Sequence, residues 1–298
     1  RVTKRFGRVV IAEDLSFTVD AGETVGIVGP NGAGKTSLFG LISGDLTPGA
    51  GQVNFAGRNI TRLDAAGRCR LGIGRTYQVP RPFTDMTVFE NVLVAAQQGG
   101  GQRRKASYAA AAGALERTGL AGDANTPAGR LGLLARKRLE IARALATGPS
   151  LLLLDEVAGG LTDPEVTVLV EIVRGVNAEG TAVVWIEHVV RALTSLVARM
   201  ACLYGGEFIG DGTPAQVLAN ARVREIYFGA DPELSQDALL PDPEKKAVSP
   251  GGTTPPNPPE KDPKDARGDA PPNPPRKIRR MPGGTTPPNP PEKDPKHE

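Results

Sequence analysis

The chain has 298 residues, enough for one large domain or two small ones, and 39% of them are hydrophobic, enough for a buried core. Its formal net charge is only +3, and most of that excess comes from a proline-rich C-terminal segment. The rest of the chain is therefore close to neutral, which argues against a nucleic-acid-binding surface. No run of about 18 apolar residues is present and no signal peptide is recognisable, so no membrane-spanning helix is predicted.

Two cysteines, Cys69 and Cys202, lie far apart in the sequence. A disulfide between them is conceivable. Buried free thiols in a reducing compartment are the better prediction for a core of this size.

Three short apolar runs are predicted to be buried parallel strands: TVGIV at residues 24–28, LLLLD at 151–155 and TAVVWIE at 181–187. Each is bounded by Gly, Pro or Ser, and a helical pattern follows it. This alternation indicates an α/β domain with helices on both faces of a parallel sheet.

Helix starts are marked by capping residues. Asp163, followed by Pro164 and Glu165, is predicted to be an N-cap, and Thr213 before Pro214 is predicted to be another. Residues 87–145 are rich in alanine and helical in pattern, with a glycine-rich break at 99–101. We expect this stretch to be a helical insert in the α/β core.

The segment GPNGAGKT at residues 29–36 fits the P-loop pattern G-x-x-x-x-G-K-[ST] and lies between a predicted strand and a predicted helix. Its glycines allow backbone N–H groups to face phosphate oxygens, and the helix N-terminus adds partial positive charge. Lys35 is expected to reach the β- and γ-phosphates, and the Thr36 hydroxyl to ligate Mg²⁺. The sequence therefore predicts ATP binding.

The strand at 151–155 ends in Asp155, with Glu156 next. In a P-loop ATPase, an acid at the carboxyl end of this second strand holds Mg²⁺, and the following glutamate orients and deprotonates the attacking water. His188 follows the strand at 181–187 at the same edge of the sheet. A neutral imidazole there could donate a hydrogen bond to the γ-phosphate.

With these residues placed, residues 1–229 resemble the ABC-transporter ATPases. Phe6 is similar to the aromatic residue that stacks on adenine, Gln78 to the Q-loop glutamine and His188 to the switch histidine. RKRLEIARAL at 136–145 resembles the helix after the family signature, and residues 159–162 lie where the D-loop lies. The resemblance implies a P-loop NTPase parallel-sheet core, an ABC-type antiparallel β subdomain and an inserted helical subdomain.

The site residues implied by motif and resemblance form three sets. Glu156 and His188 are catalytic. The ATP-binding residues are Phe6, Gly29, Pro30, Asn31, Gly32, Ala33, Gly34, Lys35, Thr36, Ser37 and Gln78. The Mg²⁺ ligands are Thr36, Gln78 and Asp155, and ATP and Mg²⁺ are the only cofactors expected.

The sequence departs from the family at its signature, which usually begins Leu-Ser-Gly-Gly-Gln. Here the residues are Leu131, Gly132, Leu133, Leu134 and Ala135. Gly132 replaces the serine whose hydroxyl would contact the γ-phosphate of the ATP on the opposite subunit. Val157 replaces the proline that usually follows the catalytic glutamate, and Thr162 ends the D-loop.

Within the family, GIGRTYQVPRPFTDMTVFENVLVA at 72–95 resembles the ATP-binding subunits of branched-chain amino-acid importers. The resemblance implies a peripheral protein on the cytoplasmic face of the membrane, bound to permease subunits near Pro80, Arg81 and Phe83. It also implies a second cassette, with a heterodimer favoured over a homodimer, and an indirect link to a solute-binding protein. No nucleic-acid partner is expected.

Three alternatives stay open: the ATPase of a lipid or lipopolysaccharide exporter, a weakly hydrolysing cassette that depends on a partner, and a soluble ABC ATPase of translation or DNA repair. The last usually carries two cassettes or a long coiled coil, and the sequence has neither.

The nucleotide-binding domain is predicted to span residues 1–240. Residues 241–298 hold 18 of the 27 prolines, and they contain GGTTPPNPPEKDPK twice, at 251–264 and 283–296. Such a composition buries little apolar surface, so a disordered tail is predicted.

Overall fold

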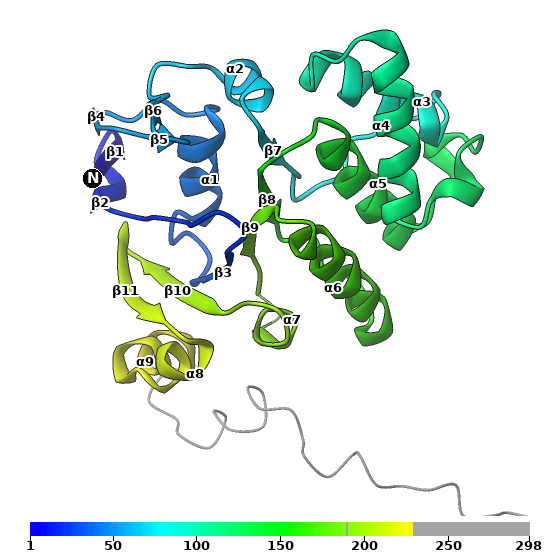
Figure 1. Ribbon diagram of the computed structural model, residues 1–298. Coiled ribbons are helices and arrows are strands. Elements are labelled where there is room, and N and C mark those ends of the chain that lie inside the picture. The colour runs from blue at the N-terminus through cyan, green and yellow to red at the C-terminus, as the bar shows by residue number, and fades with distance from the viewer. Residues whose placement is uncertain (189, 229–298) are drawn as a thin grey trace, which may run out of the picture. The chain divides into compact units, whose positions relative to one another are not determined.

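The computed structural model of the protein describes residues 1–188 and 190–228. A six-stranded sheet in the order β11-β10-β3-β9-β8-β7 forms the centre of this part (Figure 1). All neighbouring strands are parallel except the hairpin β10–β11. The strands are β3 (Thr24–Val28), β7 (Ile73–Arg75), β8 (Leu151–Asp155), β9 (Ala182–Ile186), β10 (Arg199–Tyr204) and β11 (Glu207–Gly212).

The three predicted strands are confirmed. β3 and β8 have the predicted bounds, and β9 is one residue shorter at each end than the apolar run suggests. β9 lies between the other two. Every residue of all three is buried because helices and a second sheet cover both faces.

The second sheet is antiparallel, in the order β2-β1-β4, as the family resemblance implies. Its strands are β1 (Val2–Phe6), β2 (Val9–Leu15) and β4 (Ala50–Gly51). A short hairpin, β5 (Asn54–Phe55) with β6 (Arg58–Asn59), follows it.

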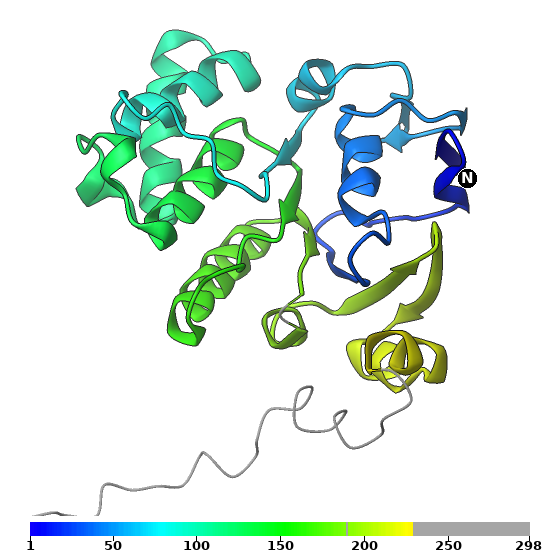
Figure 2. The same ribbon diagram turned by 180° about the vertical axis from the view of Figure 1, so that it is seen from behind.

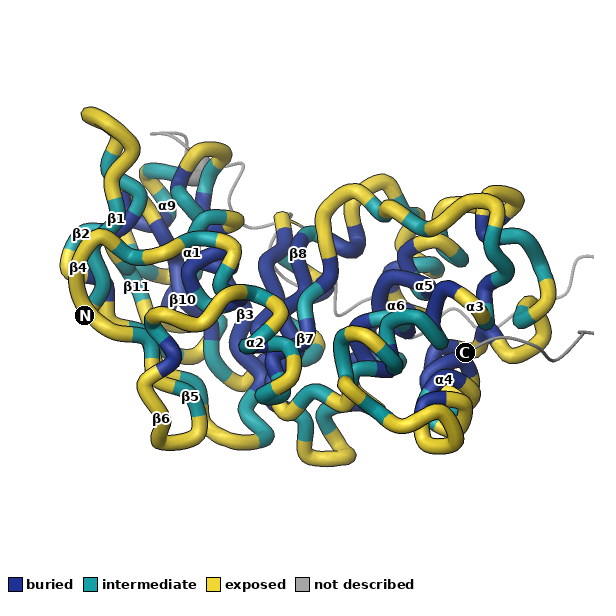
Figure 3. Tube along the Cα trace, turned by 90° about the horizontal axis from the view of Figure 1, so that it is seen from above, coloured by how far each residue is buried: buried dark blue, intermediate teal, exposed yellow. Residues whose placement is uncertain are grey.

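The helices divide between the faces of the central sheet. On one face, Leu151 and Leu153 of β8 pack with Phe39 of α1; on the other, Leu152 and Leu154 pack with α5 and α6. Alternate side chains of a strand point to opposite faces, so one apolar run serves both cores. Figure 3 shows these strands as buried and most connecting loops as exposed. The helices are α1 (Lys35–Ser43), α2 (Ala65–Arg70), α3 (Val88–Val94), α4 (Arg104–Arg117), α5 (Leu133–Ala146), α6 (Asp163–Ala178), α7 (Val190–Thr194), α8 (Pro214–Ala219) and α9 (Ala221–Phe228).

Helices α3, α4 and α5 pack on one another and occupy the stretch for which a helical insert is predicted. In Figure 2, seen from behind, they form a group beside the central sheet. A π-helical turn, Ala95–Gly99, follows α3 directly and ends at the first residue of the glycine-rich break. Short 3₁₀ turns, Ala121–Asp123 and Ala128–Arg130, connect α4 to α5.

The predicted N-cap of α6 is wrong by one residue, because Thr162, and not Asp163, caps this helix. The Glu165 carboxylate accepts hydrogen bonds from the N–H and the hydroxyl of Thr162, both at 2.8 Å. This bonding needs a glutamate three residues after the cap, which selects Thr162. Thr213 caps α8 as predicted.

Cys69 and Cys202 are both free, the first half-buried and the second fully buried. Within the described residues, every helix falls short of the length and apolarity that crossing a membrane requires. The predicted tail, residues 241–298, lies outside the described residues.

Candidate active site

The loop of residues 29–34 connects β3 to α1, and Lys35, Thr36 and Ser37 form the first turn of that helix. Two glycines are required because neighbouring backbone lies close. A Cβ at Gly29 would be 2.3 Å from the Leu203 carbonyl oxygen of β10. A Cβ at Gly34, whose φ is +98°, would be 2.9 Å from the Ile11 carbonyl oxygen of β2. The loop is thus held between two sheets.

The Lys35 ammonium lies inside this loop. Its Nζ donates to the carbonyl oxygens of Gly29 at 2.6 Å and Pro30 at 3.1 Å, and the residue is only 5% exposed. Burial lowers the pKa of Lys35, and the nearby carboxylates of Glu156 and Asp155 act in the opposite direction. A cation held here is available to phosphate groups that the loop would cradle.

Asp155 ends β8 with its side chain almost fully buried. Its Oδ2 accepts a hydrogen bond from Arg75 at 3.1 Å, whereas its Oδ1 is buried with no hydrogen-bond partner among the described residues. Burial raises the pKa of Asp155, and Arg75 opposes that shift. A buried carboxylate oxygen without a partner fits a cation ligand.

Glu156 adopts a left-handed backbone conformation with a φ of 49°, and its carboxylate joins two other predicted site residues. Oε1 lies 2.7 Å from Nε2 of His188, and Oε2 accepts from the Gln78 amide at 2.5 Å. The structure therefore brings together three residues from segments far apart in the sequence. The carboxylate is 14% exposed, which leaves it open to a water molecule.

Sequence reasoning missed Glu187 as a functional residue. It is 1% exposed, and its carboxylate accepts from the backbone N–H of Ala158 at 2.6 Å, from Trp185 at 3.2 Å and from the N–H of His188 at 3.2 Å. It ties the backbone after Glu156 to the backbone of the histidine. The sequence signal that could have indicated Glu187 is a charged residue at the end of an apolar strand.

Arg75 was also missed. Its guanidinium bridges Asp155, Asp45 at 2.7 Å and Ser43 at 3.0 Å, and it lies over the ring of Tyr77 at 5.1 Å. No local pattern signals this residue, because its hydrogen-bond partners lie 30 to 80 positions away.

Phe6 and the predicted signature residues lie on other elements than this cluster. Phe6 ends β1 with 49% of its surface exposed, and Nζ of Lys4 lies 4.9 Å from its ring centre. Gly132 is the exposed N-cap of α5, and Leu133 is exposed beside it. Within residues 1–188 and 190–228, no hydrogen bond or ion pair joins Phe6 or Gly132 to the cluster around Glu156.

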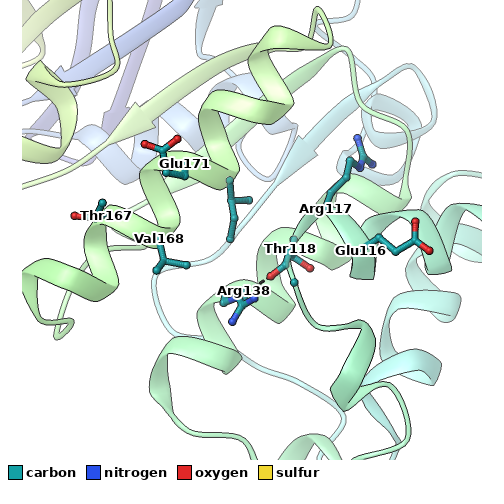
Figure 4. Close-up of a pocket in the computed structure, with 9 residues that line it drawn as sticks. Glu116, Arg117, Thr118, Arg138, Thr167, Val168 and Glu171 are labelled. Carbon is teal, nitrogen blue, oxygen red and sulfur yellow. Dashed lines mark hydrogen bonds between the residues drawn. The ribbon is translucent and has the colours of Figure 1, made fainter.

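A hollow of about 350 Å³ lies elsewhere, between α4, α5 and α6. Figure 4 shows Thr118 and Arg138 on one side of it and Thr167, Val168 and Glu171 of α6 on the other. None of its lining residues belongs to the predicted nucleotide-binding set. It is therefore separate from the site described above.

Comparison with known proteins identifies the family of this chain. A model described as ABC transporter matches residues 12–159. The branched-chain amino acid transport ATP-binding protein LivG of Salmonella typhimurium is 35% identical over 240 residues, covering 76% of this chain and 94% of LivG. The chain belongs to the ABC transporter ATPases. It is an ATP-binding, ATP-hydrolysing cassette coupled to transport, and the expected fold and activity are confirmed.

Two further similarities extend the comparison. The ATP-binding cassette MJ1267, solved in its ADP conformation, superposes with a TM-score of 0.70 at 28% identity, covering 76% of this chain and 96% of that one. The lipopolysaccharide export ATP-binding protein LptB of Acidithiobacillus ferridurans is 33% identical over 226 residues, covering 76% of this chain and 93% of LptB. A second family model, described as branched-chain amino acid ATP-binding cassette transporter, matches residues 209–233.

Proposed function

We propose that this ABC ATPase is the motor subunit of an importer for branched-chain or related amino acids. The observation that carries the catalytic part is the Glu156 carboxylate, held between Gln78 and His188 beside the phosphate loop. The solute class is supported by the similarity to LivG and by the second family model at residues 209–233.

In the proposed mechanism, the phosphate loop and Lys35 hold the β- and γ-phosphates of ATP, and Phe6 stacks on the adenine. Glu156 orients a water molecule and takes its proton as the water attacks the γ-phosphorus, while the bond from that phosphorus to the β,γ-bridging oxygen breaks and ADP leaves. His188 donates a hydrogen bond toward the γ-phosphate, and Gln78 holds the carboxylate between turnovers. Glu187 holds the backbone of His188 and the backbone just after Glu156 in fixed positions relative to each other.

Mg²⁺ fits the donor set of this site. Thr36 is exposed at the start of α1, and Asp155 offers its unpartnered Oδ1. We propose that these two residues and Gln78 would hold the ion, which would neutralise phosphate charge.

A membrane permease is the proposed partner at the segment that follows Gln78. In this segment Val79 and Phe83 expose 63% and 48% of their surfaces, and Tyr77, just before it, exposes 51%. Arg143 lies over the Phe83 ring at 5.6 Å, and a cavity of about 210 Å³ opens beside Tyr77 and Arg143. A group of exposed apolar side chains is suited to a protein contact. This contact would place the chain at the cytoplasmic face of the membrane.

A second cassette is the other proposed partner, with an unlike chain favoured over a second copy. Gly132 offers no hydroxyl to the γ-phosphate on the opposite subunit. The ATP bound to this chain would instead face whatever signature the partner brings.

The experiment that tests the function begins with purification of the tagged chain from its native membranes in mild detergent. The co-purifying subunits are identified, and the complex is reconstituted in vesicles. We expect leucine, isoleucine or valine, delivered with the solute-binding protein, to raise ATP hydrolysis. Stimulation by lipopolysaccharide and none by amino acids would instead favour the exporter class to which LptB belongs.

A further inference from the structure

The side chain of Lys137 on α5 is buried, with the residue only 4% exposed. Its Nζ donates to the carbonyl oxygen of Gln78 at 3.0 Å and to that of Glu156 at 3.3 Å. The Lys137 ammonium therefore bridges the backbones of Gln78 and Glu156, whose side chains are also hydrogen-bonded to each other. In Figure 1, α5 lies beside β7 and β8, the strands that lead into these residues, and it contacts both.

The contact with Glu156 falls at an unusual backbone position. A left-handed φ is costly for a residue with a side chain, so surrounding contacts must stabilise it. The N–H of Glu156 donates to the Ile186 carbonyl at 2.9 Å, and its carbonyl accepts from Lys137. Both backbone polar groups are thus fixed, and this conformation directs the carboxylate toward His188 and Gln78.

A second side chain of α5 holds the same segment. Glu140 lies one turn after Lys137, and its Oε1 accepts from the backbone N–H of Arg81 at 3.0 Å. Arg143 donates to Glu140 at 2.7 Å and to the Arg81 carbonyl at 3.1 Å. Glu140 and Arg143 hold residue 81 without contacting Glu156, whereas Lys137 contacts the backbone of both segments.

We propose that Lys137 is a positioning residue for ATP hydrolysis. Its side chain joins α5, the backbone at Gln78 and the backbone of Glu156 into one unit. A displacement of α5 relative to the central sheet would then shift the catalytic carboxylate and Gln78 together. The inference rests on the proposed role of Glu156 as the general base.

The test compares Lys137→Met, which keeps the length of the side chain and removes the donors, with Lys137→Arg, which keeps donors for two carbonyls. Lys105→Met, on an exposed position of α4, is the matched control. We expect Lys137→Met to bind a fluorescent ATP analogue at parental affinity while kcat falls at least about tenfold, since small misplacements of catalytic groups cost up to about 100-fold. Lys137→Arg should recover most of the rate, and the control should match the parent.

Hydrogen–deuterium exchange of the full chain without nucleotide gives a readout independent of turnover. In Lys137→Met, peptides covering residues 72–83 and 151–162 should exchange faster together, while peptides of α8 remain unchanged. Parental exchange in both segments and an unchanged kcat would overturn the proposal. Faster exchange throughout the chain, with no recovery in the arginine variant, would reduce Lys137 to a general stability role and also overturn it.

Glu156→Gln and the double variant Lys137→Met/Glu156→Gln separate this inference from the proposed function. If Lys137 acts through Glu156, the double variant is no slower than Glu156→Gln alone. Parental turnover by Glu156→Gln would refute the assignment of the base. Loss of turnover by Glu156→Gln, with a parental rate in Lys137→Met, would refute only the role of Lys137.

Discussion

Two residues of the active site, Lys35 and Glu156, are expected to separate ATP binding from ATP hydrolysis. Lys35→Ala removes the buried cation of the phosphate loop, so ATP affinity should fall below detection in equilibrium binding.

Glu156→Gln keeps the shape of the side chain and loses the base. It should retain ATP, favour the closed dimer and lose at least about 100-fold in phosphate release. Parental turnover by the glutamine variant would show that another group is the base.

Cys202 gives a pH-dependent prediction. Burial raises the pKa of its thiol from 9.0 to about 11, because the thiolate is poorly solvated next to β3. A group whose folded pKa is raised contributes stability that is complete below the unfolded pKa and is lost as pH rises through the folded pKa. Between about pH 9 and pH 11, the parent should therefore lose stability relative to Cys202→Ala, by about 2–3 kcal/mol at the upper end. Urea unfolding at a series of pH values measures this, and parallel pH curves for the two proteins would contradict it.

At the scale of elements, helix starts are set by short polar patterns. The Thr213 hydroxyl accepts from the N–H of Gln216 at 3.3 Å, and the Gln216 side chain accepts from the N–H of Thr213 at 2.9 Å. Thr213→Ala removes this cap and should lower the free energy of unfolding by about 1 kcal/mol, whereas Thr213→Ser should be nearly neutral. Denaturant unfolding of the three proteins is the measurement. An alanine variant as stable as the parent would mean that Pro214 alone is enough to start α8.

The order of strands in the central sheet determines which site residues can meet. Because β9 lies between β3 and β8, His188 after β9 can meet Glu156 after β8 at the same edge of the sheet. Parallel strands bring their carboxyl ends to one edge, where ligands bind in α/β proteins. The hydrolysis chemistry thus depends on the strand order as well as on the residues.

In the molecule as a whole, residues 241–298 are expected to contribute little to the stability of the cassette. Their proline content and scarcity of large apolar residues leave little surface to bury. Deletion of these residues should leave the melting temperature and the ATPase rate of the cassette unchanged within experimental error. Calorimetry and a phosphate-release assay on the truncated and full chains test it. A markedly lower melting temperature would move the domain boundary toward the C-terminus.

The chain alone should bind ATP and hydrolyse it slowly, and an unlike cassette with a more complete signature should raise the rate. A Cβ at Gly132 would meet nothing within 4 Å, so Gly132→Ser fits without rearrangement. The hydroxyl it adds is worth roughly 1.5–3 kcal/mol toward a charged phosphate, which predicts faster hydrolysis by the serine variant alone. Brisk turnover by the unmodified chain, with no gain from serine, would contradict the heterodimer.

The sequence by itself determined the features that depend on neighbours along the chain. The phosphate loop needs its glycines, lysine and threonine at fixed spacing, and the three buried strands needed only short apolar runs. The motif order also predicts Glu156, Gln78 and His188 as site residues, and their side chains lie in contact in the structure. The N-cap of α6 was missed by one residue because Thr162 and Asp163 are both acceptable caps, and only the bonds to Glu165 choose between them.

Only the tertiary structure decided which distant residues meet. The contact of Arg75 with Asp155 spans 80 positions, and the bond from Lys137 to Gln78 spans 59. Such pairs follow from the strand order and from the packing of α5 on the sheet, and in the sequence Arg75 and Lys137 each resemble an ordinary charged surface residue. Burial then gives these charges their importance, because a charged group removed from water must find a partner. Local sequence patterns contain neither the strand order nor the burial that follows from it.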